Sequence, residues 1–220
     1  MDFSIPIQKW YFWTPSQGEL SKTPKPTFLP AMQARRLSSV DKLALFGLEQ
    51  LDTQLNTIKT VFASQHGELE RTCKILQQMA LESDISPTLF STSVHNTASG
   101  LFSIAVENKL ASTAIAAGEN TLSAALLEAY SLLQEGDEDV GLVIADYPPN
   151  EPLDSFEELK HSPFVISLLL SKQNPSISLT LTPNKEKQNK RLDHQAAELE
   201  ALLSHKENEL TLAGWSISIA

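Results

Sequence analysis

Few residues in this sequence are of the types that perform covalent chemistry. Cys73 is the single cysteine among 220 residues, so the sequence excludes an internal disulfide and any Cys-rich metal site. It falls on the apolar side of a predicted helix, beside Leu69 and Leu76, where nothing lowers the pKa of a thiol. We therefore interpret Cys73 as a packed core residue and not as a nucleophile.

The five histidines show no HExxH spacing, and the sequence contains no GxSxG, P-loop or GxGxxG motif. His194 and Glu198 lie one helical turn apart; this spacing could hold a metal ion, but a solvated pair is the commoner outcome. Residues 214–218 resemble a nucleophile elbow that lacks its closing glycine. We predict neither a metal site nor a cofactor.

The tight turn at residues 116–121 (Ala-Ala-Gly-Glu-Asn-Thr) is the first informative position. A small-residue strand ends there, turns through Gly118 and enters a helix after Asn120. Such a junction projects one side chain toward a helix N-terminus, where backbone N–H groups favour anions. The projected residue is Glu119, which is no acyl nucleophile. The alternative is that Glu119 simply caps the helix.

The segment of residues 86–101 is the second informative position. Ala98, Ser99 and Gly100 in it allow close backbone approach, and Asn96 or Thr97 can cap a short helix. Its histidine is either catalytic or a hydrogen-bonded residue of the structure or of an interface. The residues that we predict to lie at or near an interface are His95, Asn96, Thr97, Ala98, Gly100, Leu101 and Phe102.

The charge balance excludes several classes of partner. The chain has 17 Lys and Arg against 27 Asp and Glu, a net charge of −10. Nucleic-acid binding and anionic membrane surfaces both require a basic surface. Local basic patches remain at Arg35–Arg36 and at residues 185–191. The apolar stretches are far shorter than the about 20 residues of a membrane helix, and the N-terminus does not resemble a secretory signal. We predict a cytoplasmic protein without membrane insertion.

Hydrophobic periodicity predicts an α/β fold. We expect a strand at residues 3–13, a helix that starts at Ser38 or Ser39 and extends to residue 55, a strand at 61–64, helices at 68–81 and 97–106, a strand at 113–117, a helix at 121–133 and a strand at 140–145. The alternation from residue 61 to 145 predicts right-handed crossovers and a largely parallel sheet covered by helices.

The last third of the chain adds more strands. Residues 163–170 and 176–182 are predicted strands, and the alternation in the second predicts that one of its faces is exposed to solvent. A helix with apolar residues from Leu192 to Leu203 and a final strand at 215–219 follow. We predict a single domain over residues 1–220.

Four of these segments together resemble a known family. They are residues 35–38 (Arg-Arg-Leu-Ser), 62–69 (Phe-Ala-Ser-Gln-His-Gly-Glu-Leu), 86–101 and 117–121 (Ala-Gly-Glu-Asn-Thr). The sequence is similar to the N-terminal half of β-ketoacyl synthases, and to the half-size, chain-length-factor-like subunits of aryl polyene pathways. The resemblance covers residues of about 30–145, and residues 1–30 and 150–220 match more loosely.

The resemblance implies a thiolase-like α/β fold, as a single N-terminal-type half of a condensing enzyme with extra C-terminal strands and a helix. In active ketosynthases the strand-to-helix turn carries the acyl-accepting cysteine, and two histidines follow in the C-terminal half. Here Glu119 occupies the turn, and we expect the chain to end before the half that bears those histidines. Without a thiolate no acyl-enzyme forms. The resemblance therefore implies no catalytic residue in this chain.

What remains is a subunit that pairs with a full-length β-ketoacyl synthase as a heterodimer and shapes its acyl tunnel. The resemblance also implies an acidic acyl carrier protein as an indirect partner, because two acidic proteins repel each other. Two other functions stay open at this stage. One is a free-standing enzyme that acts on acyl thioesters with Glu119 as base and His95 nearby. The other is a plain protein-interaction domain.

Overall fold

The computed structural model describes residues 2–15, 23–81, 84–136, 138–149, 153–156, 160–186 and 190–219. Its elements, in chain order, are β1 (Phe3–Trp13), α1 (Ala31–Ala34), α2 (Ser39–Glu49), η1 (Leu55–Thr57), β2 (Lys59–Ala63), α3 (Leu69–Ala80), α4 (Pro87–Ser91), α5 (Thr97–Ala105), β3 (Ser112–Ile115), η2 (Gly118–Asn120), α6 (Thr121–Gln134), β4 (Val140–Asp146), η3 (Leu153–Ser155), β5 (Phe164–Leu170), β6 (Ile177–Pro183), α7 (Leu192–Leu203), β7 (Glu209–Leu212) and β8 (Trp215–Ile219). Part of the basic run 185–191 lies outside the described residues.

The strands form one sheet in the order β3-β2-β4-β5-β1-β6-β8-β7. The predicted parallel arrangement is confirmed for β3, β2 and β4, which are linked by helical crossovers. The pairings from β4 through β5, β1, β6, β8 and β7 are antiparallel. The prediction of parallel strands was made for residues 61–145 and did not extend to these other strands, because β1 precedes that range and β5 to β8 follow it.

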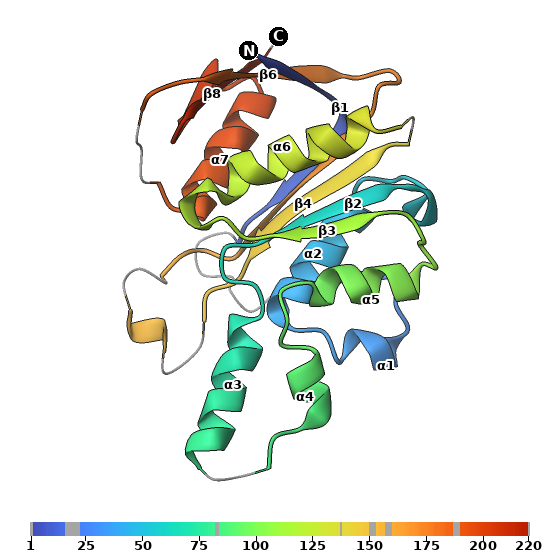
Figure 1. Cartoon of the computed structure of the whole chain (residues 1–220), viewed down its shortest axis with the longest axis vertical. Coiled ribbons are helices and arrows are strands. Elements are labelled where there is room, and N and C mark those ends of the chain that lie inside the picture. Colours follow the sequence, from blue (N-terminus) through green and yellow to red (C-terminus); the bar gives the residue numbers. More distant parts are fainter. Residues whose placement is uncertain are drawn as a thin grey trace.

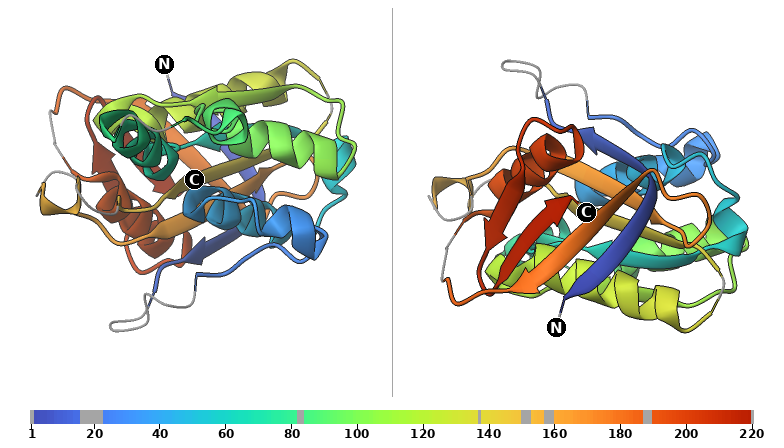
Figure 2. Two further views of the ribbon diagram at one scale, coloured as in Figure 1. Left: turned by 90° about the horizontal axis from the view of Figure 1, so that it is seen from below. Right: turned by 90° about the horizontal axis from the view of Figure 1, so that it is seen from above.

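Helices cover both faces of the sheet (Figures 1 and 2). One core lies under α6 and α7 and takes Val61, Leu142 and Ile144 from the sheet. The other lies under α2 and α5 and takes Phe62 and Val143. Successive strand residues point to opposite faces, so a strand that is buried on both sides is apolar at nearly every position. This accounts for the nearly continuous apolar sequence of β4 and β5.

The start of α2 agrees with the start predicted from the sequence, whereas its end does not. Ser38 caps α2, because its hydroxyl accepts from the Asp41 N–H while the Asp41 carboxylate accepts from the Ser38 N–H. The helix ends at Glu49, earlier than predicted, and the backbone reaches a positive φ at Asp52. The strand β7 was not predicted. It pairs with β8 through a turn at Gly214.

The helix pair α3–α4 extends beyond the sheet (Figure 1). The sequence places Leu69, Cys73 and Leu76 on the apolar side of α3, and Ala80 continues this side by one more turn. Cys73 is buried, but Leu76 is 57% exposed and Ala80 is exposed, so this prediction was wrong for the C-terminal half of the helix. The buried side of α3 instead carries a charged residue, Arg71.

Candidate functional site

A cavity of about 250 Å³ lies at the carboxyl ends of the three parallel strands. Such ends are where ligands bind in α/β sheets. The lining residues come from the turns after β2 and β3, from the end of β4, from the start of β5 and the segment before it, and from the start of α7 and the segment before it. The lining residues are Gln65, His66, Glu119, Asp146, His161, Phe164, Lys190, Arg191, Leu192 and Asp193.

Asp146 ends β4 and fixes the turn that follows β2. Its buried carboxylate accepts hydrogen bonds from the Ser64 hydroxyl at 2.5 Å and from the backbone N–H groups of Gln65 and His66 at 2.9 and 3.2 Å. The Ser64 oxygen in turn accepts from the Gly67 N–H at 2.7 Å. Asp146 therefore holds the wall of the cavity in place and is already saturated with donors.

Two histidines stack in this cavity. The rings of His66 and His161 lie 5.6 Å apart at an interplanar angle of 22°. Burial lowers the pKa of His66; the Asp146 carboxylate raises it and His161 lowers it further. The Nδ1 of His161 donates a hydrogen bond to the Ser162 carbonyl at 3.0 Å. Its buried Nε2 has no hydrogen-bond partner among the described residues.

Sequence reasoning missed this histidine pair. His66 lies in the turn that follows β2, three residues after the strand ends, and this position is a signal that it lies at the functional edge of the sheet. His161 precedes β5, whose antiparallel pairing with β4 places Phe164 opposite Asp146. This pairing of β5 with β4 brings the ring of His161 next to His66.

Glu119 lies in the turn predicted for it. Gly118 adopts φ +57°, a conformation that favours glycine, and the turn leads into α6. The interpretation of Glu119 as a helix cap was wrong, because its exposed side chain makes no hydrogen bond within the described part of the chain. The Thr121 hydroxyl binds the turn instead, accepting from the Ala117 N–H at 3.1 Å and donating to the Gly118 carbonyl at 2.7 Å.

The structure does not bring His95 and Glu119 together. The His95 Nε2 donates to the Ser64 carbonyl at 2.9 Å, and its ring lines a separate cavity of about 20 Å³ beside Asp41 and Glu68. Glu119 lines the cavity at the strand ends. The arrangement supports the reading of His95 as a hydrogen-bonded structural residue. The histidines that share a cavity with Glu119 are His66 and His161.

The remaining motifs take ordinary structural roles. Burial raises the pKa of the Cys73 thiol, which lies on α3 and does not line the cavity at the strand ends. His194 contacts Arg191 at 3.0 Å, and Glu198 binds Lys190, so the two do not pair with each other. No cluster of His, Cys, Asp and Glu within the described residues could hold a metal ion.

The predicted interface residues differ in accessibility. Phe102 is fully buried and packs against Phe62 with ring centroids 5.8 Å apart, and Thr97 is also buried. Both therefore belong to the interior of the subunit, and the placement of the segment at or near an interface stays a prediction. Asn96 is exposed, whereas His95, Ala98, Gly100 and Leu101 are half-buried. The most exposed apolar residue of α5 is Ile104, at 76%, which the sequence also indicates as apolar area next to this segment.

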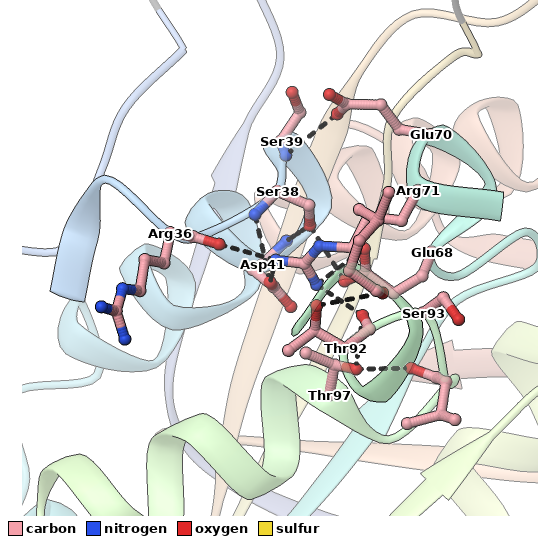
Figure 3. A network of polar contacts seen from close by, with 12 residues as sticks. Arg36, Ser38, Ser39, Asp41, Glu68, Glu70, Arg71, Thr92, Ser93 and Thr97 are labelled. Carbon is pink, nitrogen blue, oxygen red and sulfur yellow. Dashed lines mark hydrogen bonds and ion pairs between the residues drawn. The ribbon is translucent and has the colours of Figure 1, made fainter. Parts of the chain in front are cut away.

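A buried charged network fixes the base of the α3–α4 pair (Figure 3). The Arg71 guanidinium lies 3.0 Å from the carboxylates of both Asp41 and Glu68. It also donates to the carbonyls of Thr92 and Arg36 at 2.7 and 2.8 Å. Arg71 thus ties α3 to α2, to the segment after α4 and to the segment before α2.

This network contains a carboxyl group that stays protonated at neutral pH. Burial, together with the charge of Asp41 and a hydrogen bond to it, raises the pKa of Glu68 from 4.5 to about 9, against the opposing effect of Arg71. Between these two values the folded protein holds a proton that the unfolded chain releases. The free energy of unfolding therefore falls as pH rises, by at most about 1.4 kcal/mol per pH unit.

We expect Glu68→Gln to remove this pH dependence, because glutamine is neutral in both states. The stability of the variant relative to the parent protein should rise from pH 5 to pH 8, measured by urea unfolding. Glu70→Gln is the control, since the pKa of Glu70 is lowered by its bond to Lys74 and its contribution is constant above pH 5. A Glu68→Gln difference that did not change with pH would show that Glu68 is ionised in the fold.

Comparisons with known proteins are consistent with this geometry. The sequence profile described as "Beta-ketoacyl synthase, N-terminal domain" matches residues 10–215. A chain in the structure of a ketosynthase in complex with its chain length factor from Xenorhabdus doucetiae is 28% identical, with a TM-score of 0.78 over 98% of this chain and 99% of that chain. No curated protein matches the chain at a significant level.

More distant structures share the fold alone. The ishigamide ketosynthase/chain length factor matches at 13% identity and a TM-score of 0.62, over 93% of this chain and 74% of that chain. A chain in the structure of a type II polyketide acyl carrier protein in complex with its ketosynthase matches at 9% identity and a TM-score of 0.58, over 84% of this chain and 71% of that chain. The predicted thiolase-like α/β half is thus confirmed. No helix in the described ranges is long and apolar enough to span a membrane. With a profile match over nearly its whole length, this chain belongs to the β-ketoacyl synthase N-terminal domain family.

Proposed function

We propose that this protein is a non-catalytic, chain-length-factor-like subunit. It pairs in the cytoplasm with an active β-ketoacyl-[acyl carrier protein] synthase and shapes the acyl tunnel in polyketide or fatty-acid-like biosynthesis of the aryl polyene type. The observation that carries the proposal is the cavity at the strand ends. Glu119 occupies the turn where the family resemblance places a nucleophilic cysteine, and the cavity is not lined by a thiol.

The chemistry of that cavity supports a subunit without condensing activity. Condensation begins with transfer of an acyl group to a thiolate, and a carboxylate at position 119 is a poor acceptor for a thioester. Cys73 cannot replace it, because it is buried and lines a groove along α3 with Leu76 and Leu153. His66 and His161 retain basic nitrogens beside Glu119, but they have no thiol to activate.

The outer surface near α5 supports a large interface with a partner. β3 is the strand at one end of the sheet, and its residues include neither a charge nor a proline that would protect an edge. α5 lies beside it, since the hydroxyls of Ser99 and Ser112 share a hydrogen bond of 2.7 Å. Ile104 on α5 is exposed. An obligate interface on this side would bury about 2,000 Å² or more.

The helix pair α3–α4 adds apolar surface to this part of the subunit. Leu76, Met79 and Leu81 are exposed on and just after α3, and Phe90 is exposed on α4. Exposed apolar side chains raise the free energy of the subunit in water, and burial against a partner removes this contribution. A groove of about 220 Å³ beside Leu76, with an apolar lining, is suited to hydrocarbon. We expect the chain to self-associate when it is expressed without its partner.

The proposal predicts that neither the parent chain nor Glu119→Cys elongates an acyl chain on its own. The substitution supplies a thiol, but not the histidines that the family places in a second half. Each protein is incubated with malonyl- and acyl-loaded carrier protein, and products are measured by mass spectrometry. An active ketosynthase in parallel provides the positive control.

Iodoacetamide labelling completes the experiment. Position 119 is exposed and Cys73 is buried, so a rapidly labelled thiol demonstrates that the introduced cysteine is accessible. Elongated product from either protein would contradict the non-catalytic assignment.

A further inference from the structure

The His66–His161 pair joins two parts of the chain that are distant in sequence. His66 lies in the turn after β2, and His161 lies in the segment before β5. Their rings stack with centroids 5.6 Å apart, at the cavity that both residues line. We call residues 160–163 the His161 segment. Stacked imidazoles attract each other while they are uncharged, and they repel each other once both carry a proton.

The ring of His161 has no partner for a second proton in this arrangement. Its Nδ1 carries the hydrogen of the bond to the Ser162 carbonyl, because a carbonyl oxygen can only accept. A second proton therefore goes to Nε2, which is buried and has no acceptor among the described residues. A buried N–H without an acceptor is costly, and a charged one more so. Release of the ring into water would give that proton a partner.

Two carboxylates near the pair act in the opposite direction. Burial lowers the pKa of His66, the Asp146 carboxylate raises it and His161 lowers it, and the net effect is a lowering. Glu119, in the turn before α6, adds a second carboxylate to the same cavity. These carboxylates favour one proton on the pair. A second proton places two cations side by side, so we expect the pair to titrate in two steps.

The cations around the pair oppose its protonation. Lys160 is exposed next to His161 in the chain. Lys190 and Arg191 line the cavity from the segment before α7. Their own charges are paired, because Lys190 lies 2.7 Å from a carboxylate oxygen of Glu198 and Arg191 lies 2.9 Å from Asp193. Neither cation therefore withdraws the carboxylates of the cavity from the histidines.

The opposite side of the His161 segment is fixed without the histidines. The Ser162 N–H donates to the Asp193 carboxylate at 3.2 Å, and the Arg191 guanidinium donates to the Lys160 carbonyl at 2.6 Å. Arg191 and Asp193 belong to the start of α7. The segment is thus attached to α7 by hydrogen bonds that involve no imidazole. Its contact with the turn after β2 is a pair of titratable rings.

We propose that the His66–His161 stack is an acid-sensitive latch on the cavity at the strand ends. At neutral pH the uncharged rings hold the His161 segment against the turn after β2. When both rings take up a proton from solvent, the segment separates from that turn and the cavity opens. The latch consists of residues of this chain and does not rest on the proposed function.

Acid should open the latch with a defined slope. A released histidine titrates near 6.5, and His66 titrates below this value while it is stacked. Between the two values the open form binds more protons than the closed form. The equilibrium constant for opening therefore rises by up to about tenfold for each pH unit of acidification. The Glu68 effect on global unfolding has the opposite sign, because acid stabilises that network.

Opening is measured by labelling a thiol placed in the cavity wall. Leu192 lines the cavity and is 3% exposed, so Leu192→Cys in a Cys73→Ala background should react with 4,4′-dithiodipyridine when the cavity opens. Each rate is divided by the rate of the urea-unfolded chain at the same pH, which removes the intrinsic pH dependence of the thiol. We expect this ratio to rise about tenfold between pH 7.5 and pH 5.5.

Two double variants in this background identify the rings as the cause. His66→Phe/His161→Phe retains two aromatic rings that bind no proton, and its ratio should change by less than about twofold. His194→Gln/His205→Asn removes two exposed imidazoles outside the stack and should respond as the parent does. Asparagine tolerates the positive φ of position 205. A ratio that is independent of pH in the parent, or an unchanged response in the phenylalanine variant, would overturn the latch.

The rings give a second measurement that needs no substitution. Deuterium exchange at the imidazole carbon between the two nitrogens, read by mass spectrometry on the full chain, reports the protonation of each histidine. His66 should titrate at lower pH than a histidine of the unfolded chain, and the pair should titrate in two steps. Independent single steps at the ordinary value would contradict the latch even if the phenylalanine variant does not fold. Neither measurement needs a partner, so failure of the latch leaves the proposed function standing.

Discussion

Arg71→Met should destabilise the protein by about 3–5 kcal/mol, because it leaves a buried carboxylate without its counter-charge. The Arg71 side chain is 6% exposed and that of Asp41 is fully buried. The loss would be a large fraction of the about 5–15 kcal/mol that stabilises a typical domain. Urea unfolding at pH 7 measures it directly.

Two companion variants separate charge from packing. Arg36→Met removes a neighbouring guanidinium that faces away from the network, and its effect should stay within about 0.5 kcal/mol. Asp41→Asn combined with Glu68→Gln and Arg71→Met removes every charge of the network together and should recover part of the stability. A loss below 1 kcal/mol for Arg71→Met alone would mean that the network does not hold a charged Asp41.

Gly100→Arg should abolish the heterodimer while the subunit itself stays folded. A Cβ atom at Gly100 meets no atom within 4 Å, and arginine favours a helix over glycine by about 1 kcal/mol. Position 100 lies one helical turn from exposed Ile104, so the new side chain projects on the same side of α5. Burying an unpaired guanidinium against a partner is costly, and we expect an affinity loss of at least about 100-fold, or 2.7 kcal/mol.

Co-purification with a tagged ketosynthase measures this effect, and circular dichroism of the variant verifies the fold. Gly100→Ala is the matched control and should bind as the parent protein does. Ala98→Arg is a poorer probe than the sequence suggested, since Ala98 packs against the core under α2 and α5. A one-to-one complex that survives Gly100→Arg would place the interface elsewhere.

Local features of the chain were well determined by the sequence alone. The strands β4 and β5 follow from apolar runs, because a strand covered on both faces is apolar at most of its positions; the buried exceptions are Asp146 and Ser167. The start of α2 follows from Ser38 and Asp41, which satisfy each other's backbone donors. The turn at Gly118 follows from a residue that tolerates positive φ. The lack of a thiol at that turn is likewise a property of the sequence.

Contacts between distant segments were decided by the tertiary structure. Arg71 is buried because Asp41, 30 residues earlier, lies opposite it, and no periodicity within α3 contains that information. His66, Glu119 and His161 share a cavity because parallel strands end at one edge and β5 pairs antiparallel to β4. The same holds for the two basic runs. Both are visible in the sequence, but whether a carboxylate folds back onto each cation depends on packing.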